Sequence, residues 1–108
     1  MQYEERFSDA ELGTIIEEGM IYMCACPAQL AEALRKLREL HRYQMRCINQ
    51  TANDAVVHGA IADSTTQAHA LLQDCLDRVL DLEQWDRSTL QMPPHLRQRQ
   101  LREMLAED

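Results

Sequence analysis

Hydrophobic residues recur every three to four positions along most of the chain, a pattern typical of amphipathic helices. Ser8 and Glu11 form a capping box, and the periodic stretch after them predicts a first helix over about residues 9–24. Proline suits the first helical position because its missing N–H would have no helical partner there. Pro27 therefore marks the start of a second helix, over about residues 27–50, and a polar turn is expected at residues 49–53.

The second helix carries two apolar seams, which predicts contacts with two neighbouring helices. The first seam consists of Leu30, Leu34, Leu37, His41, Gln44 and Ile48. The adjacent seam consists of Ala33, Leu37, Leu40 and Cys47. Four basic residues are expected on a stripe away from this core, namely Arg35, Arg38, Arg42 and Arg46.

The third segment, about residues 54–86, has one broad apolar face, which predicts packing in the core. This face consists of Val57, Ile61, Ala68, Leu71, Leu72, Cys75, Val79 and Leu82. Ser64 and Gln67 resemble a second capping box within a small polar stretch. The segment is therefore either one long helix, which we favour, or a short helix over 54–62 that kinks into a second over 65–86.

Pro93 and Pro94 separate a helical unit at residues 1–92 from a C-terminal amphipathic arm at residues 93–108. The arm has apolar residues at Leu101, Met104 and Leu105 and basic residues at Arg97, Arg99 and Arg102. Because so short a helix is marginal alone in water, we expect it to dock on its own chain, on a second copy or on another protein. The acidic segment 74–86 would suit its arginines.

Short connections between successive helices imply antiparallel neighbours. The predicted fold class is therefore all-α, as an antiparallel three- to four-helix bundle with a C-terminal helical arm. The first helix is too short to cover the whole of the second and third, so an apolar strip is left exposed. Self-association, most simply as a two-fold homodimer, would bury that strip.

Composition narrows the class of protein further. Three glycines and three prolines in 108 residues are too few for the frequent turns of a β-sandwich or barrel. A net charge of −7 and a pI of about 5.0 disfavour nucleic acid as a partner. The chain has no apolar run of about 18 residues, so no membrane partner is expected. The N-terminal stretch lacks the apolar core of a signal peptide, which predicts a cytoplasmic protein with reduced thiols.

One group of residues indicates possible chemistry. Antiparallel folding would bring Cys24 and Cys26 to the same end of the bundle as Cys75, and a cluster of thiolates suits Zn or Cu(I). Cys26 lies at the start of the second helix, which makes it the best candidate for a reactive thiol. The C-x-C spacing is nevertheless a weak zinc motif without an evident fourth ligand, and core cysteines are the simpler interpretation.

These patterns favour a small non-enzymatic interaction or adaptor protein that acts as a homo-oligomer and binds an unidentified protein partner. The alternative is a thiolate metal-binding or redox-sensing protein that uses the Cys24-Ala25-Cys26 turn with Cys75. No catalytic or cofactor-binding residue is predicted, since the sequence contains no nucleophile elbow, phosphate loop or dinucleotide fingerprint.

Overall fold

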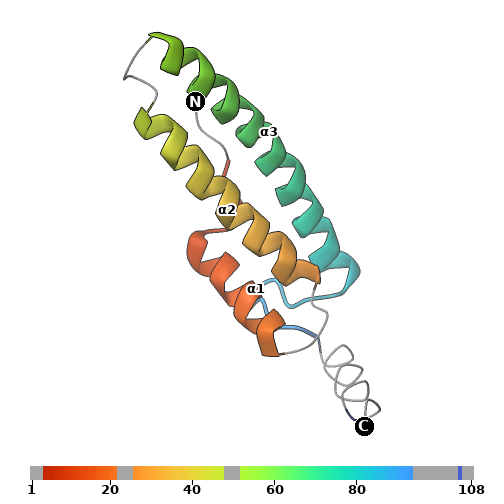
Figure 1. Cartoon of the computed structure of the whole chain (residues 1–108). Coiled ribbons are helices and arrows are strands. Elements are labelled where there is room, and N and C mark those ends of the chain that lie inside the picture. The colour runs from red at the N-terminus through yellow and green to blue at the C-terminus, as the bar shows by residue number, and fades with distance from the viewer. Residues whose placement is uncertain (1–3, 22–25, 48–51, 94–104, 106–108) are drawn as a thin grey trace.

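The computed structural model describes residues 4–21, 26–47, 52–93 and 105. Three helices make up most of these residues: α1 (Asp9–Ile21), α2 (Cys26–Cys47) and α3 (Ala52–Leu82) (Figure 1). Within the described ranges there is no strand, and only an isolated bridge joins Asp86 to Gln91. The prediction of an all-α protein is confirmed.

The first helix begins where the capping box places it. The backbone N–H of Ser8 donates to Oε1 of Glu11 at 2.9 Å, and the backbone N–H of Glu11 donates to Oγ of Ser8 at 3.0 Å. These bonds satisfy N–H groups at the helix start that have no partner inside the helix. The predicted start of α1 is therefore confirmed, whereas its predicted last turn, at residues 22–24, lies outside the described residues.

The third segment is one uninterrupted helix of 31 residues, so the single-helix interpretation is confirmed. Ser64 lies inside α3 and starts no new helix. The hydroxyl of Thr65 donates to the carbonyl of Ile61 at 2.7 Å, and that of Thr66 donates to the carbonyl of Ala62 at 2.9 Å. The small polar stretch thus satisfies its hydroxyl groups by bonding back one turn along the same helix.

Helices α2 and α3 lie side by side and run in opposite directions (Figure 1). Two contacts set their register: Arg38 bonds His69, and Gln44 bonds His58, so that numbers rise along α2 as they fall along α3. α1 packs against the half of this pair in which α2 begins and α3 ends. The apolar core there consists of Phe7, Leu12, Ile15, Ile16, Ala31, Leu34, Leu76, Leu80, Trp85, Leu90 and Met92.

Residues 83–93, which follow α3, cover one side of this core. Gln84 adopts a left-handed backbone conformation, with a φ of 63°, and the N–H of Trp85 donates to the carbonyl of Leu80 at 2.9 Å. This is the hydrogen bond of a Schellman motif, which ends a helix and reverses the chain. The reversal buries three apolar side chains against α1 and α3, those of Trp85, Leu90 and Met92.

The predicted C-terminal arm lies almost entirely outside the described residues, and so do Leu101 and Met104. Leu105 is described and is 68% exposed. The boundary at residue 93 and the docking of the arm therefore stay predictions. Separately, none of the described helices is long and apolar enough to cross a membrane.

Candidate functional site

The predicted thiol cluster is described only in part. Cys24 lies outside the described residues, Cys26 is the exposed first residue of α2, and Cys75 is exposed on α3. Among residues 4–21, 26–47, 52–93 and 105, no three His, Cys, Asp or Glu side chains are grouped to hold a metal ion. A Zn or Cu(I) site at Cys24, Cys26 and Cys75 therefore stays a prediction.

Polar side chains are buried on both α2 and α3. Six of these form the set that we call the inner polar row: Arg38, His41 and Gln44 on α2, with Thr65, His69 and Gln73 on α3. Near the turn between the helices, Nδ1 of His58 donates to Oε1 of Gln44 at 2.5 Å. The predicted burial of His41 and Gln44 on the first seam of α2 is confirmed.

Arg38 is completely buried, so its predicted position on a stripe away from the core is wrong. Its Nε donates to Nε2 of His69 at 3.0 Å, while its two terminal nitrogens donate to Oδ1 of Asp9 and to the carbonyl of Phe7, each at 2.7 Å. A buried guanidinium is stable only when its N–H groups are bonded and its charge is paired. Residues 7 and 9, which fold back over α2, supply two of these partners.

Residues 4–8, which we call the N-terminal strap, are also held by Gln73 of α3. Nε2 of Gln73 donates to the carbonyl of Glu4 at 2.8 Å, and the backbone N–H of Arg6 donates to Oε1 of Gln73 at 2.9 Å. The strap is further anchored by Phe7, whose side chain is only 3% exposed. The polar groups of Arg38 and Gln73 thus fasten the chain's own N-terminal segment.

The protonation states of this network follow from its geometry. Burial, together with the charge of Arg38, lowers the pKa of His69; the neighbouring His41 lowers it further, whereas Glu5 raises it. Because Nε2 of His69 accepts from Arg38, the neutral ring carries its proton on Nδ1. The hydrogen bond from Arg38 also lowers the pKa of Asp9. The network therefore holds an ionised Asp9 beside a neutral His69.

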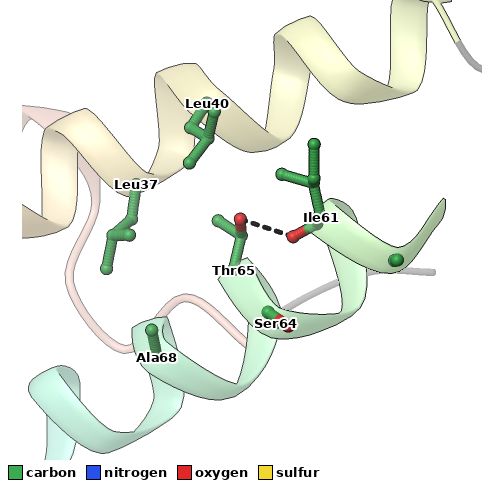
Figure 2. A pocket seen from close by; sticks show the side chains of 7 residues that line it. Leu37, Leu40, Ile61, Ser64, Thr65 and Ala68 are labelled. Atoms are coloured by element: carbon green, nitrogen blue, oxygen red, sulfur yellow. Dashed lines mark hydrogen bonds between the residues drawn. The ribbon is translucent and has the colours of Figure 1, made fainter. Parts of the chain in front are cut away.

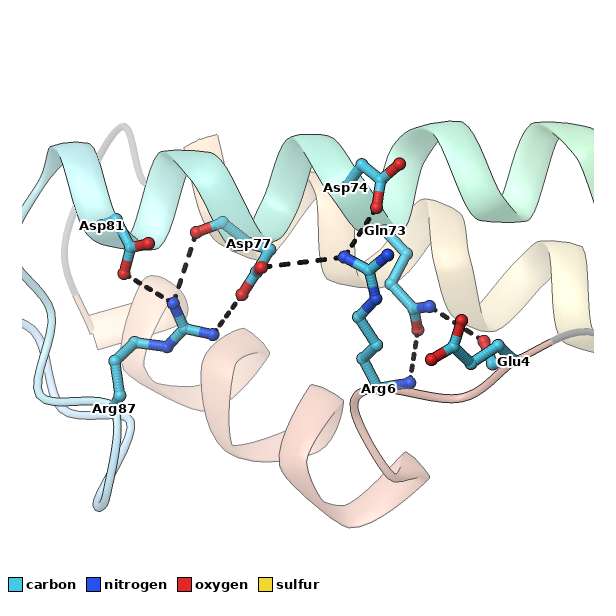
Figure 3. A network of polar contacts seen from close by, with 7 residues as sticks. All are labelled: Glu4, Arg6, Gln73, Asp74, Asp77, Asp81 and Arg87. Carbon is cyan, nitrogen blue, oxygen red and sulfur yellow. Dashed lines mark hydrogen bonds and ion pairs between the residues drawn. The ribbon is translucent and has the colours of Figure 1, made fainter.

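The acidic surface of α3 is paired with arginines from its own chain (Figure 3). Nη1 of Arg6 lies 2.6 Å from Oδ1 of Asp74, and Nη1 of Arg87 lies 2.7 Å from Oδ1 of Asp81. Arg87 also bonds Asp77. Pairs this exposed contribute only about 0–1 kcal/mol each. Three of the acidic residues expected to receive the arginines of the C-terminal arm, Asp74, Asp77 and Asp81, therefore already pair within the chain.

Most of the broad apolar face of the third segment is exposed, so its predicted place in the core is wrong for those residues, whereas Leu72 on the same face packs against the core. Val57 is 47%, Ile61 37% and Leu71 73% exposed. With their neighbours at alternating spacings of four and three they form a continuous row, which we call the outer seam: Val57, Ile61, Ser64, Ala68, Leu71 and Cys75. α3 instead turns another set of residues inward, namely Ala62, Thr65, His69, Gln73, Leu76 and Leu80.

An apolar groove lies where the outer seam meets α2 (Figure 2). Its volume is about 460 Å³, and its lining residues are Leu37, Leu40, Ala60, Ile61, Ser64, Thr65 and Ala68. The hydroxyl of Thr65 donates its hydrogen to the Ile61 carbonyl, so this hydroxyl is not a free donor for a partner in the groove. Leu37 and Leu40 belong to the second predicted seam of α2, for which the described chain supplies no covering helix. This outer groove is the candidate functional site.

The two helices that form the groove differ in charge, but the charged residues do not line it, and Nη1 of Arg42 lies 3.8 Å from Oδ2 of Asp9, on the side of α2 that faces the strap. Residues 35–47 of α2 carry four exposed basic side chains against the single acidic Glu39, namely Arg35, Lys36, Arg42 and Arg46. Residues 52–73 of α3 contain Asp54 and Asp63 and neither lysine nor arginine. No lining residue of the groove is a carboxylate, imidazole, amine or thiol. The groove can therefore bind an apolar surface, but its lining offers no general acid or base.

Four members of the inner polar row, Arg38, Thr65, His69 and Gln73, were not predicted to be buried, although a signal for the three on α3 exists. Thr65, His69 and Gln73 recur at a spacing of four, which places them on one face of α3. Only one of these two faces of α3, the polar one or the apolar one, can pack inward. The polar face does so, because backbone groups of the strap bond Gln73 on it. The second seam of α2 was predicted to contact a neighbouring helix, whereas Leu40 on that seam is 41% exposed in the described chain.

Comparison of the chain with models of protein families, with curated proteins and with solved structures finds no match in any of the three.

Proposed function

We propose that this protein is a non-enzymatic helical interaction module that acts as a homo-oligomer, most simply a dimer, through the outer groove. The observation that carries this proposal is the exposure of Leu40, at 41%, and Ile61, at 37%, on opposite walls of one apolar groove. Single exposed apolar residues are common on protein surfaces, whereas a contiguous patch marks a binding surface.

The lengths of the helices explain why the patch exists. α1 has 13 residues and spans about 20 Å, whereas α3 has 31 residues and spans about 46 Å. α1 therefore covers one half of the α2–α3 pair and leaves the other half as a two-helix layer. Two helices from a second chain would cover that layer and complete the bundle that we propose as the architecture.

We place this module in the cytoplasm. Cys26 and Cys75 are exposed and free, and thiols of this kind persist in a reducing compartment. Their exposure is therefore compatible with the proposed location.

Sedimentation velocity of the full chain tests the proposal. At micromolar concentrations we expect the mass of two or more chains, and a species of 12.5 kDa at every concentration would contradict it. Leu40→Glu places a charge in the outer groove and should shift the protein to monomer. Because Leu40 is already partly exposed, the variant should keep its helical circular dichroism.

Val56→Glu is the matched control. Val56 is 71% exposed and is not among the residues that line the groove, so the same change in charge should leave the assembly intact. If both variants dissociate, added negative charge alone is responsible and the groove is not the interface. If neither dissociates, the chain associates through another surface.

A further inference from the structure

We propose that the N-terminal strap is a pH-sensitive latch: when His69 takes up a proton, the strap opens more readily from the α2–α3 pair while the three helices stay folded. This proposal goes beyond the proposed function and does not depend on the outer groove.

The strap is held through its backbone by two side chains of the inner polar row. Gln73 bonds the carbonyl of Glu4 and the N–H of Arg6, and Arg38 bonds the carbonyl of Phe7. Opening the strap breaks these bonds but breaks no hydrogen bond inside a helix. It also takes the buried ring of Phe7 out of the core, so the closed strap predominates at neutral pH.

The opening can stop where α1 begins. Ser8 and Glu11 cap α1 through hydrogen bonds that they make with each other. Asp9, the first residue of α1, bonds the buried guanidinium of Arg38. An opening that stops before Ser8 therefore preserves the cap of α1 and leaves the charge of Arg38 paired with Asp9. A buried charge that keeps its partner does not oppose the opening.

His69 is flanked by the two side chains that hold the strap. It lies one helical turn from Gln73 on α3, its ring is only 1% exposed, and its Nε2 accepts from Nε of Arg38 at 3.0 Å. A protonated ring has no acceptor nitrogen and carries a positive charge. In the closed strap such a ring would lose its bond to Arg38 and would face the guanidinium as a like charge.

The charged and titratable groups around His69 act in both directions. Arg38 and His41 of α2 oppose its protonation, whereas Glu5 of the strap favours it, and Asp9 pairs with the guanidinium of Arg38. The neighbours of His69 one turn away on α3 are uncharged. Burial has the largest effect and lowers the pKa of His69, so the departure of Glu5 with the strap does not change the direction.

The sign of the pH dependence follows from the burial. Opening the strap lets water reach the ring, so the pKa of His69 rises toward its ordinary value of 6.5. A proton therefore binds the open state more tightly than the closed state. The closed strap is fully favoured above about pH 6.5 and becomes less favoured as the pH falls below it.

Native-state hydrogen exchange of the full chain tests this latch. The amide of Arg6, which donates to Gln73, reports on the strap, and the amide of Leu76, buried within α3, reports on the helices. Each rate is divided by the rate of an unprotected amide at the same pH, which gives an opening constant. Between pH 7 and pH 5 we expect the opening constant at Arg6 to rise about tenfold.

Urea separates a local opening from unfolding of the whole chain. A local opening exposes little surface, so the opening constant at Arg6 should depend weakly on urea and that at Leu76 strongly. Equal opening constants with equal urea dependence at the two amides would overturn the proposal, because the strap would then open only on unfolding. An opening constant at Arg6 that is unchanged between pH 7 and pH 5 would overturn it as well.

His69→Gln and His58→Gln are matched variants on α3. Glutamine at position 69 keeps an acceptor for Arg38 but does not titrate, so the rise at Arg6 should disappear. His58 bonds Gln44 near the turn between the helices, so His58→Gln should keep the rise. A rise that persists in His69→Gln would assign the proton to another group and overturn the latch. The two measurements on the wild-type chain decide the proposal even if His69→Gln does not fold.

Discussion

The two faces of the α2–α3 pair reverse the usual placement of polar and apolar residues. The face turned to the strap buries Arg38, His69 and Gln73, whereas the face turned away from it exposes Leu40 and Ile61. On the inner face Arg38 and Gln73 bond named backbone groups of the strap, so that face holds one segment of chain in one position. The outer face has few polar groups to satisfy, and its stability gains come from covering apolar area. The inner face therefore specifies the fold of one chain, and the outer face is suited to association.

Among changes to the inner face, Arg38→Ala should reduce the stability of the fold the most. The change removes three hydrogen bonds at once and leaves the carbonyl of Phe7 and the ring of His69 without their buried donor. We expect a loss of about 3 kcal/mol in the free energy of unfolding, measured by urea denaturation. Arg35→Ala on the exposed side of the same helix should change it by no more than about 0.5 kcal/mol. Equal effects would mean that the burial of Arg38 contributes nothing.

Arg38 also shows what the sequence could and could not predict. The start of α1 and the continuity of α3 depend on residues a few positions apart, and both were predicted. The burial of Arg38 depends on Phe7 and Asp9, which lie 31 and 29 positions away and reach it only because the strap folds back. Helical periodicity contains no information on that return, so Arg38 was assigned to an exposed basic stripe with Arg35, Arg42 and Arg46.

The outer seam shows the same limit in reverse. Periodicity correctly grouped Val57, Ile61 and Leu71 on one face of α3, since side chains three and four positions apart share a face. It could not indicate whether the neighbour of that face belongs to the same chain. The strap needed the polar face of α3, and the apolar face was therefore left outward. Of the candidate site, the α2 wall was predicted as a seam and the α3 wall was misassigned to the core of one chain.

A smaller disruption of the inner face is Gln73→Ala. Gln73 makes one bond to the carbonyl of Glu4 and one to the N–H of Arg6, and its side chain is only 2% exposed. We expect a loss of about 1–2 kcal/mol in the free energy of unfolding, with faster hydrogen exchange at the amide of Arg6. The exposed Gln67 on the same helix provides the control, since Gln67→Ala should alter neither quantity. Unchanged exchange at Arg6 would show that the strap is held without Gln73.

The inner face should also respond to pH, and the outer face should not. Folding lowers the pKa of His69 below its ordinary value of 6.5, because burial and Arg38 disfavour the charged ring. Below about pH 6.5 the His69 ring of the unfolded chain therefore binds a proton that the folded chain does not bind. The contribution of His69 to stability is fully present above about pH 6.5 and declines as the pH falls below it. Asp9, whose pKa is lowered by Arg38, contributes a separate loss at pH values below about 4.

Thermal denaturation between pH 7 and pH 5 measures this effect, and we expect the Tm to fall by a few degrees. His69→Gln keeps an acceptor for the Arg38 guanidinium but does not titrate, so its Tm should vary less over the same range. Assembly through the outer groove involves no titrating side chain and should not change in that range. A wild-type Tm that is constant from pH 7 to pH 5 would contradict a buried neutral His69.

The smallest effect concerns the reactivity of thiols on the outer face. Cys75 lies on the outer seam and is exposed in the single chain, whereas Cys47 is half-buried near the end of α2. In Leu40→Glu, the variant expected to be monomeric, Cys75 should therefore react with iodoacetamide faster than Cys47. In the assembled wild-type chain a partner helix would cover the outer seam, and the rate at Cys75 should fall several-fold. Peptide mass spectrometry reports both rates, and Val56→Glu should match the wild type. If Cys75 reacts equally fast in wild type and in Leu40→Glu, the part of the outer seam around it stays exposed in the oligomer, and the contact between subunits is confined to the outer groove itself.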